Sequence, residues 1–330
     1  MSTDTEPRPG IAGGTARRDL EANRRARRAL FGCAAITVLT TLAIFFVLID
    51  NAASYFFGAR ITEMLLGASA EQKVTFTEFF TGTRWAPDHA TPAHGALPII
   101  FGTLAITVGA AFVSIPIGTA TAIYLSEYAS DGVRAKLKPT LEILAGIPTI
   151  VYGYFAIAFI NPVVLAPIAE ALFGINIGRY SMLSGILVVG IMTIPMVSSI
   201  SEDSMSAVPD DLRNGAYALG ATRFDVSTKI VLPASISGVF ASYILAVSRA
   251  IGETMAVTLA AGFNANVTAN PFSEIMTMTA YMVSMARGTS AVGTVEYQSL
   301  FAVGLVLFVM TLTMNLLNDR FKRRFQEEYR

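Results

Sequence analysis

The chain of 330 residues is 53% hydrophobic and only 15% charged, and its 24 basic residues balance its 24 acidic ones. Soluble domains are about one-quarter charged, so this composition indicates a membrane protein, and the lack of a basic excess argues against a nucleic-acid partner. The single cysteine, Cys33, lies in an apolar run and excludes a disulfide framework and a thiolate metal site, while His89 and His94 lack the spacing of metal ligands.

The N-terminal third of the chain contains one apolar segment between two polar ones. Residues 1–29 hold seven arginines with Pro, Gly, Thr and Glu, and are expected to form a disordered cytoplasmic tail. Residues 30–49 carry no charge and are long enough to cross a bilayer. This run is too long for a signal peptide, and no small-residue cleavage site ends it. Residues 50–96 are polar and are expected to pack as a small cap on the outer side.

Five further apolar segments follow in residues 97–317, which we expect to form the core of the protein. They are 97–125, 141–160, 182–200, 235–262 and 299–317. Pro116 and three glycines within the first of these predict a kinked helix that packs closely on its neighbours. The sequence therefore predicts an all-α polytopic membrane protein with six transmembrane helices and a C-terminal tail over residues 318–330.

The basic residues predict the orientation of these spans. If both termini are cytoplasmic, 18 of the 24 lysines and arginines lie on the cytoplasmic side and five in the outer loops. This distribution follows the positive-inside rule. It also places the polar segment 208–233 in the cytoplasm.

Residues 208–233 are predicted to form two short helices joined by a turn. Pro209 followed by two aspartates suits a helix start, and Gly220 suits a left-handed helix end. Thr222 and Asp225 have the spacing of a loose capping box for a second helix, which Pro233 ends. The apolar face of the first helix is expected to contain Val208, Leu212, Ala216 and Leu219.

We call this predicted helix–turn–helix segment, residues 208–233, the elbow. Its sequence resembles the cytoplasmic loop signature of bacterial ABC importer permeases, which runs EAA, three residues, G, nine residues, I-x-L-P. The matching positions are Asn214, Gly215, Ala216, Gly220, Ile230, Leu232 and Pro233, with Leu219 just before the glycine. The usual Glu and first Ala are replaced by Asn214 and Gly215 here. The resemblance implies a type I importer permease architecture in which the elbow docks into a separate ATPase subunit. The alternative is an ordinary helical hairpin between two spans.

The segment 235–262 carries two charges where the membrane should exclude them, Arg249 and Glu253. Each costs about 2.5–3.5 kcal/mol at the bilayer centre, so burial in protein or a wet cavity must offset them. Their spacing of four predicts one helical face, shared with Ser242 and bordered by Ser248 and Thr254. We interpret this polar stripe as one wall of a substrate path.

The residue types suggest binding of an oxyanion. The guanidinium of Arg249 presents a planar fork of donors that can pair with two phosphate oxygens, and Glu253 can accept a hydrogen bond from a P–OH group. The alternative is a structural pair in which the two charges only neutralise each other.

Two further runs resemble PstC-type permeases of phosphate-specific ABC importers. These are RAIGETMAV, beginning at Arg249, and AGIPTIVYG, over residues 145–153. The resemblance associates Arg249 and Glu253 with passage of phosphate. It implies a bacterial plasma membrane location, a second permease of the PstA type, two copies of an ATP-binding subunit and an extracytoplasmic phosphate-binding protein.

The chain is not expected to be an enzyme, because no G-x-x-x-x-G-K-[ST] motif occurs in it. ATP and Mg are expected on the partner ATPase, with no cofactor in this chain. The alternatives left open are a permease for molybdate, sulfate or phosphonate, an ion-coupled secondary carrier, and a homodimer in place of the two different permeases.

Overall fold

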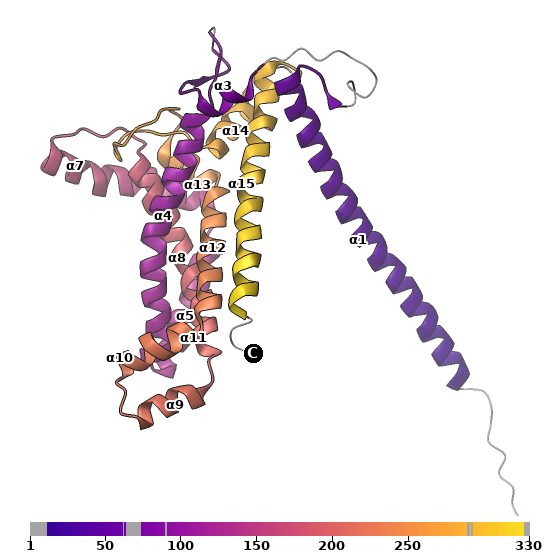
Figure 1. Ribbon diagram of the computed structural model, residues 1–330, viewed down its shortest axis with the longest axis vertical. Coiled ribbons are helices and arrows are strands. Elements are labelled where there is room, and N and C mark those ends of the chain that lie inside the picture. Colours follow the sequence, from indigo (N-terminus) through magenta and orange to yellow (C-terminus); the bar gives the residue numbers. More distant parts are fainter. Residues whose placement is uncertain are drawn as a thin grey trace, which may run out of the picture. The chain divides into compact units, whose positions relative to one another are not determined.

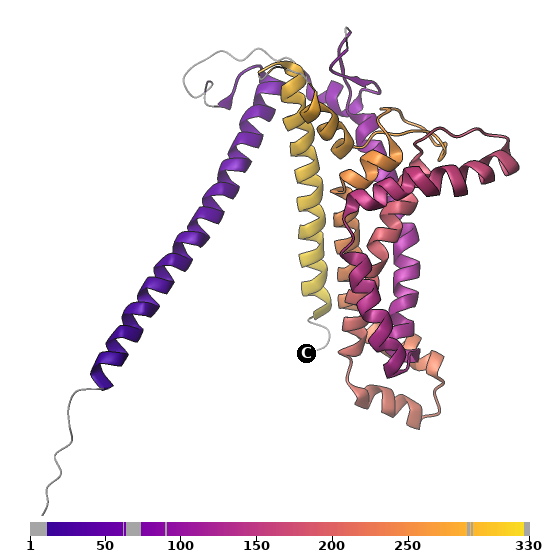
Figure 2. The ribbon, with the colours of Figure 1, turned by 180° about the vertical axis from the view of Figure 1, so that it is seen from behind.

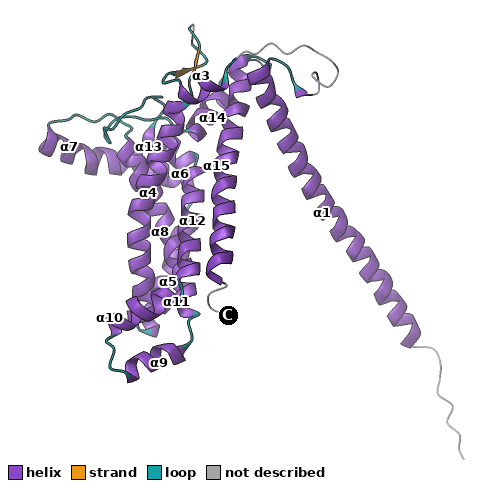
Figure 3. Ribbon diagram, viewed as in Figure 1, coloured by secondary structure: helices purple, strands orange, loops and turns teal. Residues whose placement is uncertain are grey.

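The computed structural model describes residues 12–61, 63, 74–89, 91–288, 291 and 293–326. The described chain is mostly helical, with one short two-stranded hairpin (Figures 1 and 3). It divides into two units, Met1–Asp50 and Asn51–Arg330, which are described separately.

The first unit consists of most of helix α1, Ala12–Phe57. The helix begins eighteen residues before Leu30, so the expected disorder over residues 12–29 is corrected to helix, while residues 1–11 lie outside the described part. The correction has a local cause. Residues 15–29 contain no proline and are rich in Ala and Arg, which are strong helix formers. The helix of the apolar run therefore continues through them.

The apolar helices of the chain confirm the polytopic architecture. Five helical stretches are long and apolar enough to cross a membrane, namely Asn23–Phe57, Leu97–Tyr128, Thr149–Phe173, Met182–Ser206 and Val295–Phe321. A sixth span arises if the helices Arg223–Ala234 and Ile236–Ile251, bent by 73° at their junction, are counted together. The chain thus has five or six spans among its described residues.

Helices α4 (Leu97–Ile123), α8 (Met182–Ser206), α12 (Ile236–Ile251) and α15 (Val295–Gln326) run side by side in both views (Figures 1 and 2). The close approach of α4 and α8 depends on glycines. A Cβ at Gly118 would lie 2.7 Å from Cβ of Val197, and one at Gly109 would lie 2.6 Å from Cδ1 of Ile186. This confirms the close packing predicted for the second span, in which backbones meet because one partner has no side chain.

The third span lies further along the chain than the hydropathy of residues 141–160 predicted. Helix α5 (Asp131–Ala145) ends at Gly146, and the membrane stretch begins only at Thr149, with α6 (Thr149–Phe155), the π-helical segment η2 (Ala156–Leu165) and α7 (Ala166–Phe173). Pro148 explains the shift, because its ψ of 136° is extended and a proline disfavours helix in the residue before it. The predicted outer loop after residue 160 therefore contains α7, which points away from the neighbouring helices in Figure 2.

The polar segment after the first span forms a cap with an aromatic core. Helix α3 (Phe76–Thr81) and the hairpin of β1 (Trp85–Ala86) and β2 (Ala93–His94) pack with α14 (Met278–Arg287). The hydroxyl of Tyr55 lies 3.0 Å from Nδ1 of His94. Burial lowers the pKa of His94, which favours the neutral imidazole.

Helix α15 runs on to Gln326, so residues 318–326, expected to belong to a tail, are helical. Residues 327–330 lie outside the described part. Lysine and arginine are good helix formers, which accounts for this extension beyond the apolar stretch.

Candidate functional site

The elbow consists of α9 (Asp210–Ala218), α10 (Arg223–Asp225), the π-helical segment η3 (Val226–Val231) and α11 (Leu232–Ala234). Gly220 has a φ of +84° and supplies the left-handed turn between the two helical arms, as predicted. The Thr222 hydroxyl accepts a hydrogen bond from the backbone N–H of Asp225 at 3.2 Å and donates to its carboxylate at 2.6 Å. The two helix signals read from residues 208–233 are therefore confirmed.

The second arm carries an ion pair that fixes the charge of the capping residue. Lys229 Nζ lies 2.6 Å from Oδ1 of Asp225, one helical turn away. This hydrogen bond, with that from Thr222, lowers the pKa of the Asp225 carboxyl to about 2. Asp225 is thus ionised throughout the physiological range.

The signature positions divide between an inner and an outer surface of the elbow. Ala216 and Leu232 pack on a small core of Met205, Val208, Val226, Val231 and Val239, and Ile230 is half-buried. Asn214, Gly215, Gly220 and Pro233 are exposed, and Leu219 is 90% exposed. The apolar face predicted for the first helix is thereby corrected, because α9 ends at Ala218 and Leu219 and Leu212 point to solvent.

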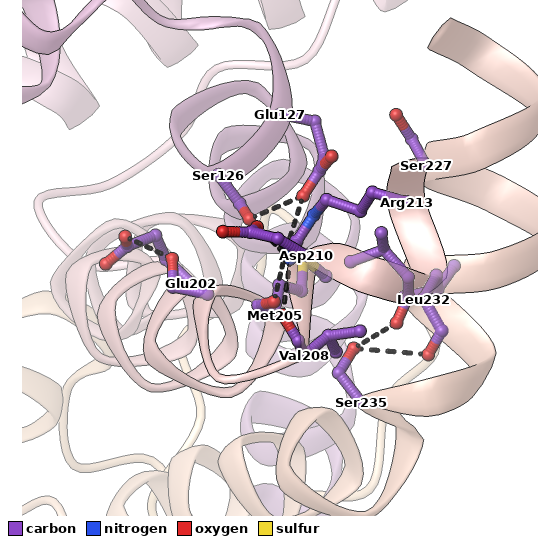
Figure 4. A network of polar contacts seen from close by, with 12 residues as sticks. Ser126, Glu127, Glu202, Met205, Val208, Asp210, Arg213, Ser227, Leu232 and Ser235 are labelled. Carbon is purple, nitrogen blue, oxygen red and sulfur yellow. Dashed lines mark hydrogen bonds and ion pairs between the residues drawn. The ribbon is translucent and has the colours of Figure 1, made fainter. Parts of the chain in front are cut away.

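A partly buried cation that sequence reasoning missed, Arg213, ties the elbow to the membrane helices (Figure 4). Arg213 donates from Nη2 to the Met205 carbonyl at 2.8 Å and to the Glu127 carboxylate at 3.2 Å, and from Nη1 to the Val208 carbonyl. Its Nη1 also lies 3.2 Å from the Asp210 carboxylate. One side chain therefore satisfies the Met205 carbonyl in the last turn of α8 and the Val208 carbonyl just after the helix. It also pairs with Glu127, which lies 86 positions earlier, in the π-helical segment η1 (Tyr124–Tyr128) after α4.

A second ionic cluster joins α5 to the same end of α8. Glu202 is fully buried and pairs with Arg134 and with Lys138, whose Nζ lies 2.7 Å from its carboxylate. Lys138 also lies 2.6 Å from Asp203, and these hydrogen bonds, chiefly that with Asp203, raise the pKa of the lysine. Spacing alone gives no signal for the pairing of Lys138 with Glu202 or of Arg213 with Glu127, because the two residues of each pair are more than sixty positions apart.

Arg249 and Glu253 do not lie on one continuous helix. Helix α12 ends at Ile251, and α13 begins at Met255, so Glu253 falls in a break of three residues. Its Oε1 accepts a hydrogen bond from the backbone N–H of Ala256 at 3.1 Å, and its carbonyl accepts one from Thr279 at 2.7 Å. The unbroken helix on which the predicted one-face geometry rested is therefore not formed: Gly252 is a poor helix former, and the Glu253 carboxylate caps the helix that follows.

The remaining residues of the predicted stripe face different neighbours. Ser242 is fully buried and its hydroxyl bonds to that of Ser201 in α8 at 2.8 Å, so it serves helix packing. Ser248 points toward Asn315 of α15, with 3.5 Å between their side-chain oxygens. Thr254 stays at the break, where its hydroxyl donates to the Gly252 carbonyl at 3.2 Å. Glu253 and Thr254 thus both lie at the break after α12, whereas Ser242 lies against α8, away from the break.

The two charges differ in environment. Glu253 is 8% exposed, whereas the Arg249 side chain is exposed and, in the described part of the chain, its guanidinium forms no ion pair or hydrogen bond. The break also borders a cavity of about 360 Å³ lined by Gly252, Thr254, Thr279 and apolar side chains of α14 and α15. An unpaired arginine on an apolar helix needs an anion or water from outside the chain.

Solved structures share this arrangement of helices. A bacterial ABC transporter involved in the import of the acidic polysaccharide alginate matches with a TM-score of 0.62, at 13% identity over 94% of this chain and 99% of that one. The MetNI methionine ABC transporter, in an inward-facing conformation, matches with a TM-score of 0.51, at 18% identity over 69% of this chain and 94% of that one. The fold is therefore that of the type I ABC importer permeases.

Sequence comparison agrees with the fold. Residues 114–327 match the family described as "Binding-protein-dependent transport system inner membrane component". The probable ABC transporter permease protein YqgH of Bacillus subtilis is 33% identical over 85% of this chain and 87% of that protein. The phosphate transport system permease protein PstC of Mesorhizobium japonicum is 32% identical over 71% and 74%, and PstC of Haemophilus influenzae is 32% identical over 86% and 90%. The chain belongs to this family of ABC transporter permeases.

Proposed function

We propose that the chain is the permease subunit of an ATP-driven importer of inorganic phosphate and forms part of the translocation pathway. Its similarity to proteins described as the phosphate transport system permease protein PstC supports phosphate as the substrate. The observation that carries the proposal is Arg249, an exposed cation on an apolar helix without a partner in the described chain. Such a residue is costly in a membrane unless an anion or water reaches it, and an anion that passes through the protein meets this need.

The chemistry of the two charged residues fits phosphate. Arg249 offers two parallel donors to two oxygens of one anion, which a lysine cannot do. The Glu253 carboxylate is held beside the same break by its hydrogen bond to Ala256. A carboxylate there accepts a hydrogen bond from a protonated phosphate and repels the fully ionised sulfate, so the pair would favour phosphate among oxyanions.

The elbow supplies the contact with the motor. Leu212, Leu219 and Phe224 are at least half exposed on its outer surface, and they form an apolar projection suited to a groove on another protein. We assign this groove to an ATPase subunit, present in two copies and carrying ATP and Mg. A PstA-type permease and an extracytoplasmic phosphate-binding protein complete the complex, which lies in the bacterial plasma membrane with both termini of this chain cytoplasmic.

We infer that transport follows alternating access. Closure of the ATPase pair would displace the elbow, whose second arm joins α12 at Ser235 with a bend of 73°. Because Arg249 lies in the last turn of α12, movement of the elbow would rock this helix and open Arg249 to one side of the membrane and then to the other. The ionic contacts of Arg213 would make the elbow move as one body with the end of α8.

Uptake of radiolabelled phosphate into vesicles tests the proposal. The vesicles contain this chain with its PstA-type partner and the ATPase, the binding protein is outside, and ATP is inside. We expect uptake that requires both ATP and the ATPase, and that excess unlabelled sulfate or molybdate does not inhibit. Inhibition by those anions would indicate another oxyanion as substrate. Uptake without the ATPase would indicate a secondary carrier and contradict the proposal.

A further inference from the structure

Three arginines share one face of α1 near its N-terminal end. Arg24, Arg27 and Arg28, with Phe31, line a surface cavity of about 550 Å³. Their spacings of three, four and seven place these four side chains on one side of a helix. All four are exposed, and Phe31 is 75% exposed.

The depth of this face follows from the length of the apolar run. Residues 29–49 carry no charge, and at 1.5 Å per residue the run from Leu30 to Ile49 spans about 30 Å, the thickness of the hydrocarbon core. Since α1 is helical from Ala12 through Phe57, the arginines leave the hydrocarbon within two turns of its edge. They therefore lie at the level of the lipid headgroups, and Phe31 lies beside the first part of the acyl chains.

The charge of this face has no counterpart in the chain. No acidic residue occurs between Glu21 and Asp50, and in the part of α1 that the structure describes Arg24, Arg27 and Arg28 form no ion pair. Guanidinium groups bind phosphate oxygens with paired hydrogen bonds, and the surrounding surface at this depth is lipid.

We propose that Arg24, Arg27, Arg28 and Phe31 form a binding site for an anionic phospholipid in the leaflet at the N-terminal end of α1. The guanidinium groups bind the headgroup phosphates, and Phe31 packs on an acyl chain. Three cations within about one helical turn match a headgroup with two phosphates, so cardiolipin binds more tightly than phosphatidylglycerol, and phosphatidylcholine binds least.

Native mass spectrometry of the full chain, released from detergent after addition of each lipid, tests this site. The unchanged chain should retain cardiolipin in preference to phosphatidylglycerol and phosphatidylcholine. Near a membrane surface each arginine strengthens binding of an anionic lipid by about fivefold, so R27Q/R28Q should weaken retention of cardiolipin by about 25-fold. Circular dichroism of the same sample checks that the helices are intact.

The matched control is R25Q/R320Q, which removes the same two charges. Arg25 lies outside the cavity, and Arg320 lies near the end of α15. This variant should retain cardiolipin as the unchanged chain does. An equal loss in both variants would show that only net charge matters, and no loss in R27Q/R28Q would show that the arginines do not bind lipid. Displacement of the lipid by millimolar inorganic phosphate would assign the cavity to the free anion. Any one of these three outcomes would overturn the proposal.

Discussion

The two ends of α12 are held in different ways. Next to its start, Arg213 binds Met205, Val208 and Glu127, and the elbow core closes over Val239, so the charge of Arg213 has its partners within the chain. At its end, the helix breaks at Gly252, and Arg249 has no partner in the described residues. The elbow therefore has its ionic contacts in place before it binds any other protein. At the end of α12, by contrast, the charge of Arg249 must be balanced by an anion or water from outside the chain.

The substitution with the largest expected effect removes the unpaired charge. In Arg249→Ala the hydrogen bonds to the anion are lost, and two charge-assisted bonds of about 1.5–3 kcal/mol each correspond to a decrease in phosphate uptake of about 100-fold or more. Uptake by reconstituted vesicles measures it, and co-purification of the subunits shows whether the complex still forms.

Arg249→Lys and Ser242→Ala are the controls for this prediction. Lys keeps the charge without the fork and should recover only part of the uptake. Ser242 bonds to Ser201 within the packed helices, so its substitution should leave uptake near that of the unchanged chain. If Arg249→Ala prevents assembly, the residue has a structural role and the comparison between the two ends of α12 fails.

The elbow end should respond to Arg213→Ala by losing stability. The substitution leaves Glu127, with 4% of its side chain exposed, without its cation, and breaking a buried pair of this kind costs about 3 kcal/mol. Denaturant unfolding in mild detergent measures the loss. Arg223→Ala is the matched control, because the Arg223 side chain is exposed and its guanidinium lies over the Tyr128 ring, 5.3 Å from the ring centroid. This substitution should cost less than about 1 kcal/mol. Equal costs for the two variants would contradict the importance of the buried pair.

Gly220→Val should uncouple the elbow from the ATPase. A residue with a Cβ at a φ of +84° costs about 1–2 kcal/mol, and a β-branched one costs more, so the turn between the two arms would rearrange. ATP-driven uptake should fall while the membrane helices remain folded. In the control Gly215→Ala nothing lies within 4 Å of the added Cβ, and the substitution favours helix α9, so uptake should not fall. Normal uptake by Gly220→Val would show that this turn is not needed for coupling.

The smallest effect concerns the charge of Asp225. Its pKa of about 2 lies below the ordinary value of 3.8, so its contribution to the stability of the elbow is complete above pH 3.8 and is lost as the pH falls through about 2. Lys229→Met removes the main cause and should raise this pKa toward the ordinary value. Carbon-13 NMR of labelled aspartate carboxylates in the full chain measures both titrations. An unchanged titration in the variant would exclude the Lys229 contact as the cause.

Much of the fold and part of the site could be predicted, because their signals lie in neighbouring residues. Hydropathy located the apolar helices, and the helix signals at Pro209, Gly220 and Thr222 placed the two arms of the elbow within a residue or two. These features depend on the backbone and on side chains a few positions apart, and packing elsewhere does not change them. Sequence by itself therefore determined that the chain has several membrane helices and where the elbow turns, although it placed the third span at 141–160 where the structure has Thr149–Phe173.

Tertiary structure alone decided which polar residues meet. The pairing of Arg213 with Glu127 and the bond of Ser242 to Ser201 join residues far apart in the chain, and the spacing of these residues does not predict either contact. The placement of Arg249 and Glu253 on one face assumed an unbroken helix, and that assumption failed at Gly252, where a carboxylate caps the next helix. Local periodicity cannot show such a break, because hydropathy is the same on both sides of it and the contacts that hold it, such as Thr279 to the Glu253 carbonyl, come from another helix.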